Sequence, residues 1–192
     1  IGRVNDRYFV NTVAAGVMPE AVGSVSIEQK TRLGPMAYFL TGLKALQSRR
    51  TSLFKIESDE GTEVRRSPLI VAMLTSSVGS FNNIAPKAKV DDGTIWLAVF
   101  KEFNYLDVLK VIPEVLAGLP INSEYMTLTQ IKKARISIVD DEKLSTNMDG
   151  DKGPDFPLEL EVCPSFLSVY VPRKAVQTGF NPIVVPKELF HG

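Results

Sequence analysis

The stretch SSVGSFNNIAPKAKVDDG, residues 76–93, leads directly into the apolar run TIWLAVF at residues 94–100. It contains a turn around Gly79, an Ala-Pro corner at residues 85–86 and an Asp-Asp-Gly turn at residues 91–93. Glycine favours such reverse turns because it adopts positive φ without a Cβ clash. The pattern therefore predicts two turns on either side of a short link between strands.

Short β-branched and alternating segments predict strands along most of the chain. These segments are residues 8–13, 53–58, 62–67, 69–75, 95–100, 125–139 (one strand or two), 156–162 and 165–171. Asp59-Glu60-Gly61 predicts a hairpin, and Cys163-Pro164 is interpreted as a second one. Helical spacing predicts one helix that begins at Gly34-Pro35 and another over residues 105–116. The pattern is typical of a β-sandwich or barrel of roughly ten strands with two helices.

Composition excludes several classes of protein. The 192 residues carry 22 basic and 22 acidic side chains, so bulk charge indicates no nucleic-acid partner. The longest apolar runs, such as residues 69–74, are far too short to cross a bilayer. The lone Cys163 fits a reducing compartment. The chain begins with Ile1 close to a strand and without an apolar leader, and we expect a fragment of a larger protein.

Four segments, taken in order, resemble one known family. They are YFVN at residues 8–11 with Gly16, RLGPMAY at residues 32–38, the stretch at residues 76–93, and NMDGD at residues 147–151, which is followed by LELEV at residues 158–162. Together they are similar to the second domain of the soluble diacylglycerol kinases, a family of bacterial-type lipid kinases. The resemblance extends from about residue 3 to about residue 173 and implies a mainly β, antiparallel sandwich.

The resemblance also implies a function. Residues 1–174 would form the lipid-substrate domain of an ATP-dependent kinase that converts diacylglycerol to phosphatidic acid, and the tail at residues 175–192 would pack on a nucleotide-binding domain. Members hold ATP with a Gly-Gly-Asp-Gly-Thr loop, which this sequence lacks, so the chain alone is expected to be inactive. We expect a cytoplasmic protein at the membrane surface, where it meets its lipid substrate, and a homodimer is compatible with this assignment.

One catalytic residue follows from the resemblance. In the family, a glutamate after Asp-Gly is taken as the base that accepts the lipid hydroxyl proton, and the matching residue here is Asp151. Aspartate is one methylene shorter, and reach decides proton transfer. The alternative is an ordinary turn carboxylate. Asp149 is expected to support the turn by bonding its own backbone.

A metal site follows from the same resemblance. The family holds a structural Mg²⁺ at the Asp-Asp-Gly turn, and the matching ligands are the carbonyl groups of Lys89 and Thr94 and the carboxylate of Asp92. Such hard oxygen ligands suit magnesium, which keeps several waters. The alternative is a turn that binds no metal.

Two other functions remain open at this point. Composition alone favours a non-catalytic β-sandwich that binds a ligand or a protein partner. A kinase that acts on another lipid alcohol, such as a sphingoid base or a polyprenol, would share the same motifs.

Overall fold

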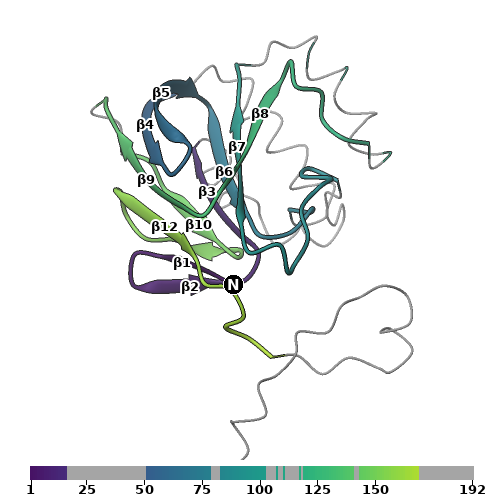
Figure 1. The fold of residues 1–192 in the computed structure, drawn as a ribbon. Helices are drawn as coiled ribbons and strands as arrows, with labels where there is room; N and C mark the ends of the chain where they lie inside the picture. Colours follow the sequence, from purple (N-terminus) through teal and green to yellow (C-terminus); the bar gives the residue numbers. More distant parts are fainter. Residues whose placement is uncertain are drawn as a thin grey trace, which may run out of the picture.

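The structure is a computed structural model, and it describes residues 1–16, 51–78, 83–102, 107, 110, 117, 119–140 and 143–168. The described residues form two six-stranded antiparallel sheets that face each other (Figure 1). Sheet A contains, in spatial order, β2 (Arg7–Phe9), β1 (Gly2–Val4), β12 (Leu158–Val162), β9 (Lys133–Ile138), β4 (Ser52–Ser58) and β5 (Gly61–Ser67). Sheet B contains β11 (Asp151–Lys152), β10 (Thr146–Met148), β3 (Thr12–Gly16), β6 (Leu69–Met73), β7 (Ile95–Phe100) and β8 (Met126–Ile131).

The main core lies between the two sheets. It is built from inward side chains of both, among them Val4, Phe9, Phe54, Ile95 and Leu158, all at most 1% exposed. Strands β1, β9 and β12 of sheet A alternate between buried and exposed residues, as expected for a sheet with one wet face. The predicted mainly β, sandwich-like fold is therefore confirmed.

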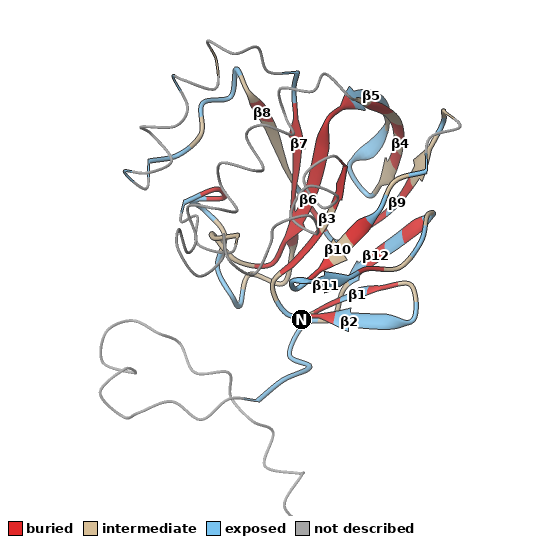
Figure 2. Ribbon diagram, turned by 180° about the vertical axis from the view of Figure 1, so that it is seen from behind, coloured by how far each residue is buried: buried red, intermediate tan, exposed pale blue. Residues whose placement is uncertain are grey.

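Sheet B is also covered on its outer face. A second apolar cluster joins the outward residues of β6 and β7 to Ile84 and Ala85. For this reason β6 and β7 are buried along their whole length, which Figure 2 shows as continuous red strands. The predicted link at residues 76–93 thus connects β6 to β7, and Ile84 and Ala85 of this link pack on the sheet.

One long predicted strand needs revision, and at another segment the alternative of two strands is confirmed. The expected single strand at residues 8–13 is wrong: β2 ends at Phe9 in sheet A, and β3 begins at Thr12 in sheet B. The segment at residues 125–139 forms two strands, and these also lie in different sheets, β8 in sheet B and β9 in sheet A. In both places the chain crosses from one sheet to the other.

Each crossing is held by an aspartate from a hairpin turn elsewhere. The Asp59 carboxylate, in the turn between β4 and β5, accepts hydrogen bonds from the backbone N–H groups of Lys132 and Lys133. Partial desolvation opposes ionisation of Asp59, but these backbone bonds outweigh it and lower the pKa of the carboxyl. Asp149 has the same role at the other crossing, where it accepts hydrogen bonds from the backbone N–H groups of residues 10–12.

The remaining expectations have mixed outcomes. The hairpin through Asp59 and Gly61 is confirmed, and the described part has twelve short strands where roughly ten were expected. The hairpin through Cys163-Pro164 is wrong in its described part, because residues 165–168 form no strand. The helix at Gly34-Pro35 and the tail at residues 175–192 lie outside the described residues. So does the helix at residues 105–116, apart from Asp107 and Lys110, which are helical.

Candidate functional site

The candidate base Asp151 lies on a tight hairpin at the edge of sheet B. β10 and β11 are joined by two residues, Asp149 at φ 52° and Gly150 at φ 100°. Two consecutive positive φ values are typical of a type I′ turn, for which Asp-Gly is a preferred pair. The turn predicted at NMDGD is therefore confirmed, and it makes Asp151 the first residue of the edge strand β11.

The Asp149 carboxylate ties this hairpin to the crossing between β2 and β3. It accepts hydrogen bonds from three consecutive backbone N–H groups, those of Val10 (2.7 Å), Asn11 (2.9 Å) and Thr12 (2.8 Å). These groups lie where the chain leaves sheet A for sheet B, so neither ladder can satisfy all of them. The predicted bond from Asp149 to its own turn is wrong, because the carboxylate bonds a segment that is 137 to 139 residues away.

Arg7 makes a second tie on the other side of Asp151. Its guanidinium donates to the backbone carbonyl oxygen of Lys152 at 2.8 Å. Arg7 lies in β2, an edge strand of sheet A, and Lys152 lies in β11, an edge strand of sheet B. The bond therefore joins these two edges of the sandwich. Figure 2 shows β11 beside β1 and β2, near the N-terminus.

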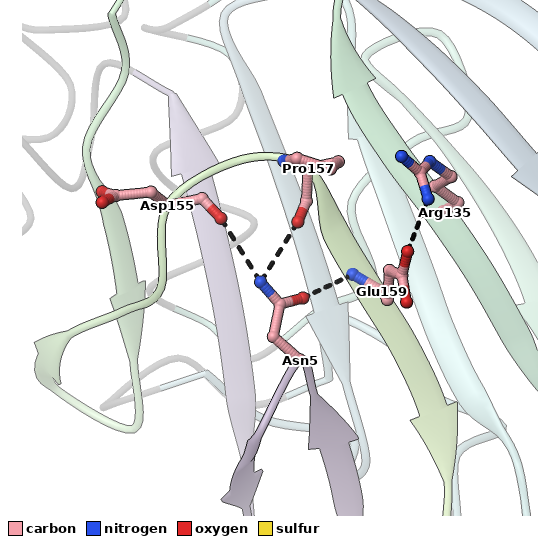
Figure 3. Close-up of polar contacts among 5 residues, drawn as sticks. All are labelled: Asn5, Arg135, Asp155, Pro157 and Glu159. Carbon is pink, nitrogen blue, oxygen red and sulfur yellow. Dashed lines mark hydrogen bonds and ion pairs between the residues drawn. The ribbon is translucent and has the colours of Figure 1, made fainter.

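Asn5 makes a third tie, at the turn between β1 and β2 (Figure 3). Its amide nitrogen donates to the carbonyl oxygens of Pro157 (3.1 Å) and Asp155 (3.4 Å), and its amide oxygen accepts the N–H of Glu159 (2.8 Å). The chain between β11 and β12 is thereby held against the first hairpin. Glu159 also forms an exposed ion pair with Arg135.

The three ties form one continuous seam. Residues 5–12 run antiparallel to residues 149–159, with Asn5, Arg7 and the N–H groups of residues 10–12 as successive contacts. Within this seam the Asp151 side chain is exposed and forms no hydrogen bond or ion pair with any described residue. Within the described part of the chain, Asp151 is therefore an unengaged carboxylate on a backbone that is held on both sides.

The predicted metal ligands lie in one turn before β7. The Asp92 carboxylate accepts four hydrogen bonds: Oδ1 from the N–H (2.9 Å) and hydroxyl (2.7 Å) of Thr94, and Oδ2 from the Trp96 indole (3.0 Å) and the Lys89 N–H (3.1 Å). Burial alone would raise the pKa of Asp92. The bonds from Trp96, Lys89 and Thr94 outweigh burial and lower the pKa.

This geometry bears on how well the turn suits a cation. The oxygen ligands are of the kind Mg²⁺ prefers, and the Lys89 carbonyl oxygen accepts the Asp92 N–H in the same turn. A carboxylate offers about four lone-pair sites, and protein donors use four here. A cation would therefore have to replace one donor, and the longest of these bonds comes from the Lys89 N–H. Among the described residues, no cluster of three or more His, Cys, Asp or Glu side chains could hold a metal.

The structure does not bring the two predicted sites together. Asp92 precedes β7, and Asp151 begins β11, four strands away in the order of sheet B. Strands lie about 4.8 Å apart, so this separation is roughly 19 Å across the sheet. Any role of Asp92 in chemistry at Asp151 would be indirect.

None of the described helical segments is both long and apolar enough to cross a membrane.

Comparisons with known proteins agree on one family. The model described as "YegS C-terminal NAD kinase beta sandwich-like domain" matches residues 11–171. A diacylglycerol kinase of Bacillus subtilis is 30% identical over 177 residues, which cover 92% of this chain and 58% of that protein. A diacylglycerol kinase of Staphylococcus carnosus is 28% identical over 178 residues, which cover 93% of this chain and 58% of that protein.

A crystal structure of a diacylglycerol kinase from Bacillus anthracis shares the fold, with a TM-score of 0.62 at 20% identity. The match covers 85% of this chain and 52% of that one. The chain thus spans between about half and three-fifths of the length of these relatives.

Proposed function

Because this chain belongs to the family of YegS C-terminal, NAD-kinase-like β-sandwich domains, we propose that it is the substrate domain of an ATP-dependent kinase that phosphorylates diacylglycerol. The product would be phosphatidic acid. The family and the names of its relatives support lipid kinase chemistry. The choice of diacylglycerol as the acceptor is the finer part of this proposal.

In the proposed reaction Asp151 is the general base. Its carboxylate accepts the proton of the lipid hydroxyl while that oxygen forms a bond to the γ-phosphorus of ATP, and the bond from this phosphorus to the bridging oxygen breaks to release ADP. Positioning and charge stabilisation supply most of the catalysis in such transfers. The observation that carries the proposal is the unengaged Asp151 carboxylate on a backbone tied at both sides, because a general base must be free to reach its proton and be held in place.

The other parts of the enzyme follow from this assignment. We propose that ATP is bound by the portion of the relatives that this chain does not span, that residues 1–174 form the lipid-substrate domain, and that residues 175–192 pack on that portion. The lipid would be met at the membrane surface by a cytoplasmic protein, with a homodimer compatible. Mg²⁺ would be held by the Lys89 and Thr94 carbonyl oxygens and by Asp92, and would brace the turn before β7.

A lipid kinase assay on the full-length protein tests the function. Diacylglycerol, a sphingoid base and a polyprenol are offered in mixed micelles with ATP and Mg²⁺, and phosphorylated lipid is measured. We expect diacylglycerol to be the preferred acceptor and Asp151→Asn to lower kcat by about 10²- to 10⁴-fold. Asp155→Asn is the matched control, since Asp155 lies in the connection that follows β11 and only its backbone carbonyl is used in the seam.

The outcomes separate the parts of the proposal. Transfer to another alcohol with the same dependence on Asp151 would change the substrate and keep the mechanism. An unchanged rate in Asp151→Asn would remove Asp151 from the reaction. A full-length protein that transfers phosphate to none of these lipids would favour a non-catalytic binding module.

A further inference from the structure

We propose that Arg7 is a positioning residue for Asp151, acting through the backbone of β11; this rests on the proposed function. The contact that carries it is the hydrogen bond from the Arg7 guanidinium to the carbonyl oxygen of Lys152, the residue directly after Asp151. Arg7 reaches this carbonyl from the other sheet, 145 residues away in sequence.

The place of β11 explains why such a tie matters. β11 consists of two residues and, among the described strands, is an edge strand that pairs only with β10. A short edge strand exposes unpaired backbone groups and opens easily. The Arg7 guanidinium donates to the Lys152 carbonyl the hydrogen bond that a neighbouring strand would otherwise supply. Without it, the hairpin after Gly150 is held by its pairing with β10 and by the bond from the Gly153 N–H to the Thr146 carbonyl.

The Asp151 side chain depends on this backbone for its position. Since its carboxylate has no hydrogen bond to another described residue, only the conformation of β11 fixes where it points. Displacement of a catalytic group by about 1 Å can cost on the order of 10²-fold in rate. Asp149 fixes the residue two positions before Asp151, and Arg7 fixes the residue after it.

Arg7 has a matched control in the same hairpin. Arg3 lies in β1, is exposed like Arg7, and pairs with Glu161 on the outer face of sheet A. Replacing either arginine removes one positive charge from the same two-stranded unit. Only Arg7 contacts the strand that carries Asp151, so a difference between the two variants reports on that contact.

The experiment uses the full-length kinase with Arg7→Gln, Arg7→Lys, Arg3→Gln, Asp151→Asn and the double variant Arg7→Gln/Asp151→Asn. We expect Arg7→Gln to lower kcat at least about tenfold with an unchanged KM for the lipid, and Arg7→Lys to recover part of the rate because a lysine can still donate to the carbonyl. Arg3→Gln should keep the wild-type kcat. In the Asp151→Asn background, Arg7→Gln should change kcat by less than about twofold, since it acts through the lost carboxylate.

A second measurement does not depend on activity. Amide hydrogen exchange over residues 147–153 should be faster in Arg7→Gln than in the wild type or Arg3→Gln, with the same midpoint of global unfolding in urea. An unchanged kcat in Arg7→Gln beside an inactive Asp151→Asn would overturn the positioning role and leave the proposed function intact. The positioning role would also be overturned if the loss of kcat in the double variant equalled the product of the two single losses. Unchanged amide exchange over residues 147–153 in Arg7→Gln would overturn it as well. If Asp151→Asn is itself fully active, both the catalytic assignment and the positioning role are refuted.

Discussion

Asp149 and Thr12 bind each other twice. The Thr12 N–H donates to the Asp149 carboxylate at 2.8 Å, and the Asp149 N–H donates to the Thr12 carbonyl at 2.9 Å. Thr12 is the first residue of β3, and Asp149 is the first residue of the turn that precedes Asp151. This reciprocal pair fixes the candidate site to the point where the chain crosses between the sheets.

We predict that Asp149→Asn destabilises the fold. The amide keeps one acceptor oxygen, but its NH₂ group would oppose one of the three backbone donors at residues 10–12. A donor left without a partner costs about 1 to 3 kcal/mol when buried, and we expect about 1 kcal/mol at this partly exposed position. Urea denaturation measures the loss. Asp155→Asn is the control and should unfold as the wild type does; equal stability of the two variants would show that the bonds from Asp149 to residues 10–12 do not stabilise the fold.

A second prediction concerns close packing between β1 and β2. A Cβ atom added at Gly2 would lie 2.2 Å from Cζ of Phe9, whose ring is fully buried in the core. We therefore expect Gly2→Ala to lower the free energy of unfolding by about 1 to 3 kcal/mol, as overpacking does. In the double variant Gly2→Ala/Phe9→Leu, the smaller leucine side chain should restore part of the free energy of unfolding that Gly2→Ala loses. A loss that is simply additive with that of Phe9→Leu would show that the ring does not set the requirement for glycine.

The third prediction is a pH dependence reported by Trp96. Hydrogen bonds lower the folded-state pKa of Asp92 below its ordinary value of 3.8, against the effect of burial. The stabilisation from Asp92 is therefore present above about pH 4, and it is lost as the pH falls through the lower folded pKa. Because Trp96 is the only tryptophan and donates to Asp92, its fluorescence should change in that acidic range. Asp92→Asn should abolish the transition, whereas Asp91→Asn should retain it; a transition that persists without the Asp92 carboxylate would assign it elsewhere.

The fourth prediction tests the proposed magnesium. If a cation binds the Asp92 carboxylate by replacing the Lys89 N–H, the Trp96 bond to the same Oδ2 atom should change as well. Titration of Mg²⁺ should then produce a saturable change in Trp96 fluorescence, and EDTA should reverse it. The change should be absent in Asp92→Asn. No response at millimolar Mg²⁺ would mean that protein donors alone hold this turn.

Local patterns predicted the elements whose partners are near in sequence. The hairpin at Asp59 and Gly61 and the turn at Asp149 and Gly150 could be predicted because each depends on a few adjacent residues whose φ angles glycine or a small polar residue permits. The buried strands β6 and β7 could be predicted from their continuous apolar runs. Asp151 entered only through a family resemblance, since an aspartate after Asp-Gly is otherwise an ordinary turn residue.

The prediction of one strand over residues 8–13 failed where the chain changes sheets. The sequence is continuously β-like across residues 8–13, because strand propensity does not encode which sheet a residue joins. The break at Val10 and Asn11 is set by the Asp149 carboxylate, and the break at Lys132 is set by Asp59. No local signal marks these donors and acceptors as partners.

Local sequence patterns were enough for most of the strands, for the turns at Asp59-Gly61 and Asp149-Gly150 and for the apolar runs of β6 and β7, since each follows from side chains within a few residues of one another. Tertiary structure alone decided that residues 5–12 lie along residues 149–159 and hold the Asp151 backbone with Asn5, Arg7 and Asp149. The physical reason is that these ties join side chains to backbone groups. Every residue offers nearly the same N–H and C=O, so the identity of the partner depends on which segments the folded sheets bring together.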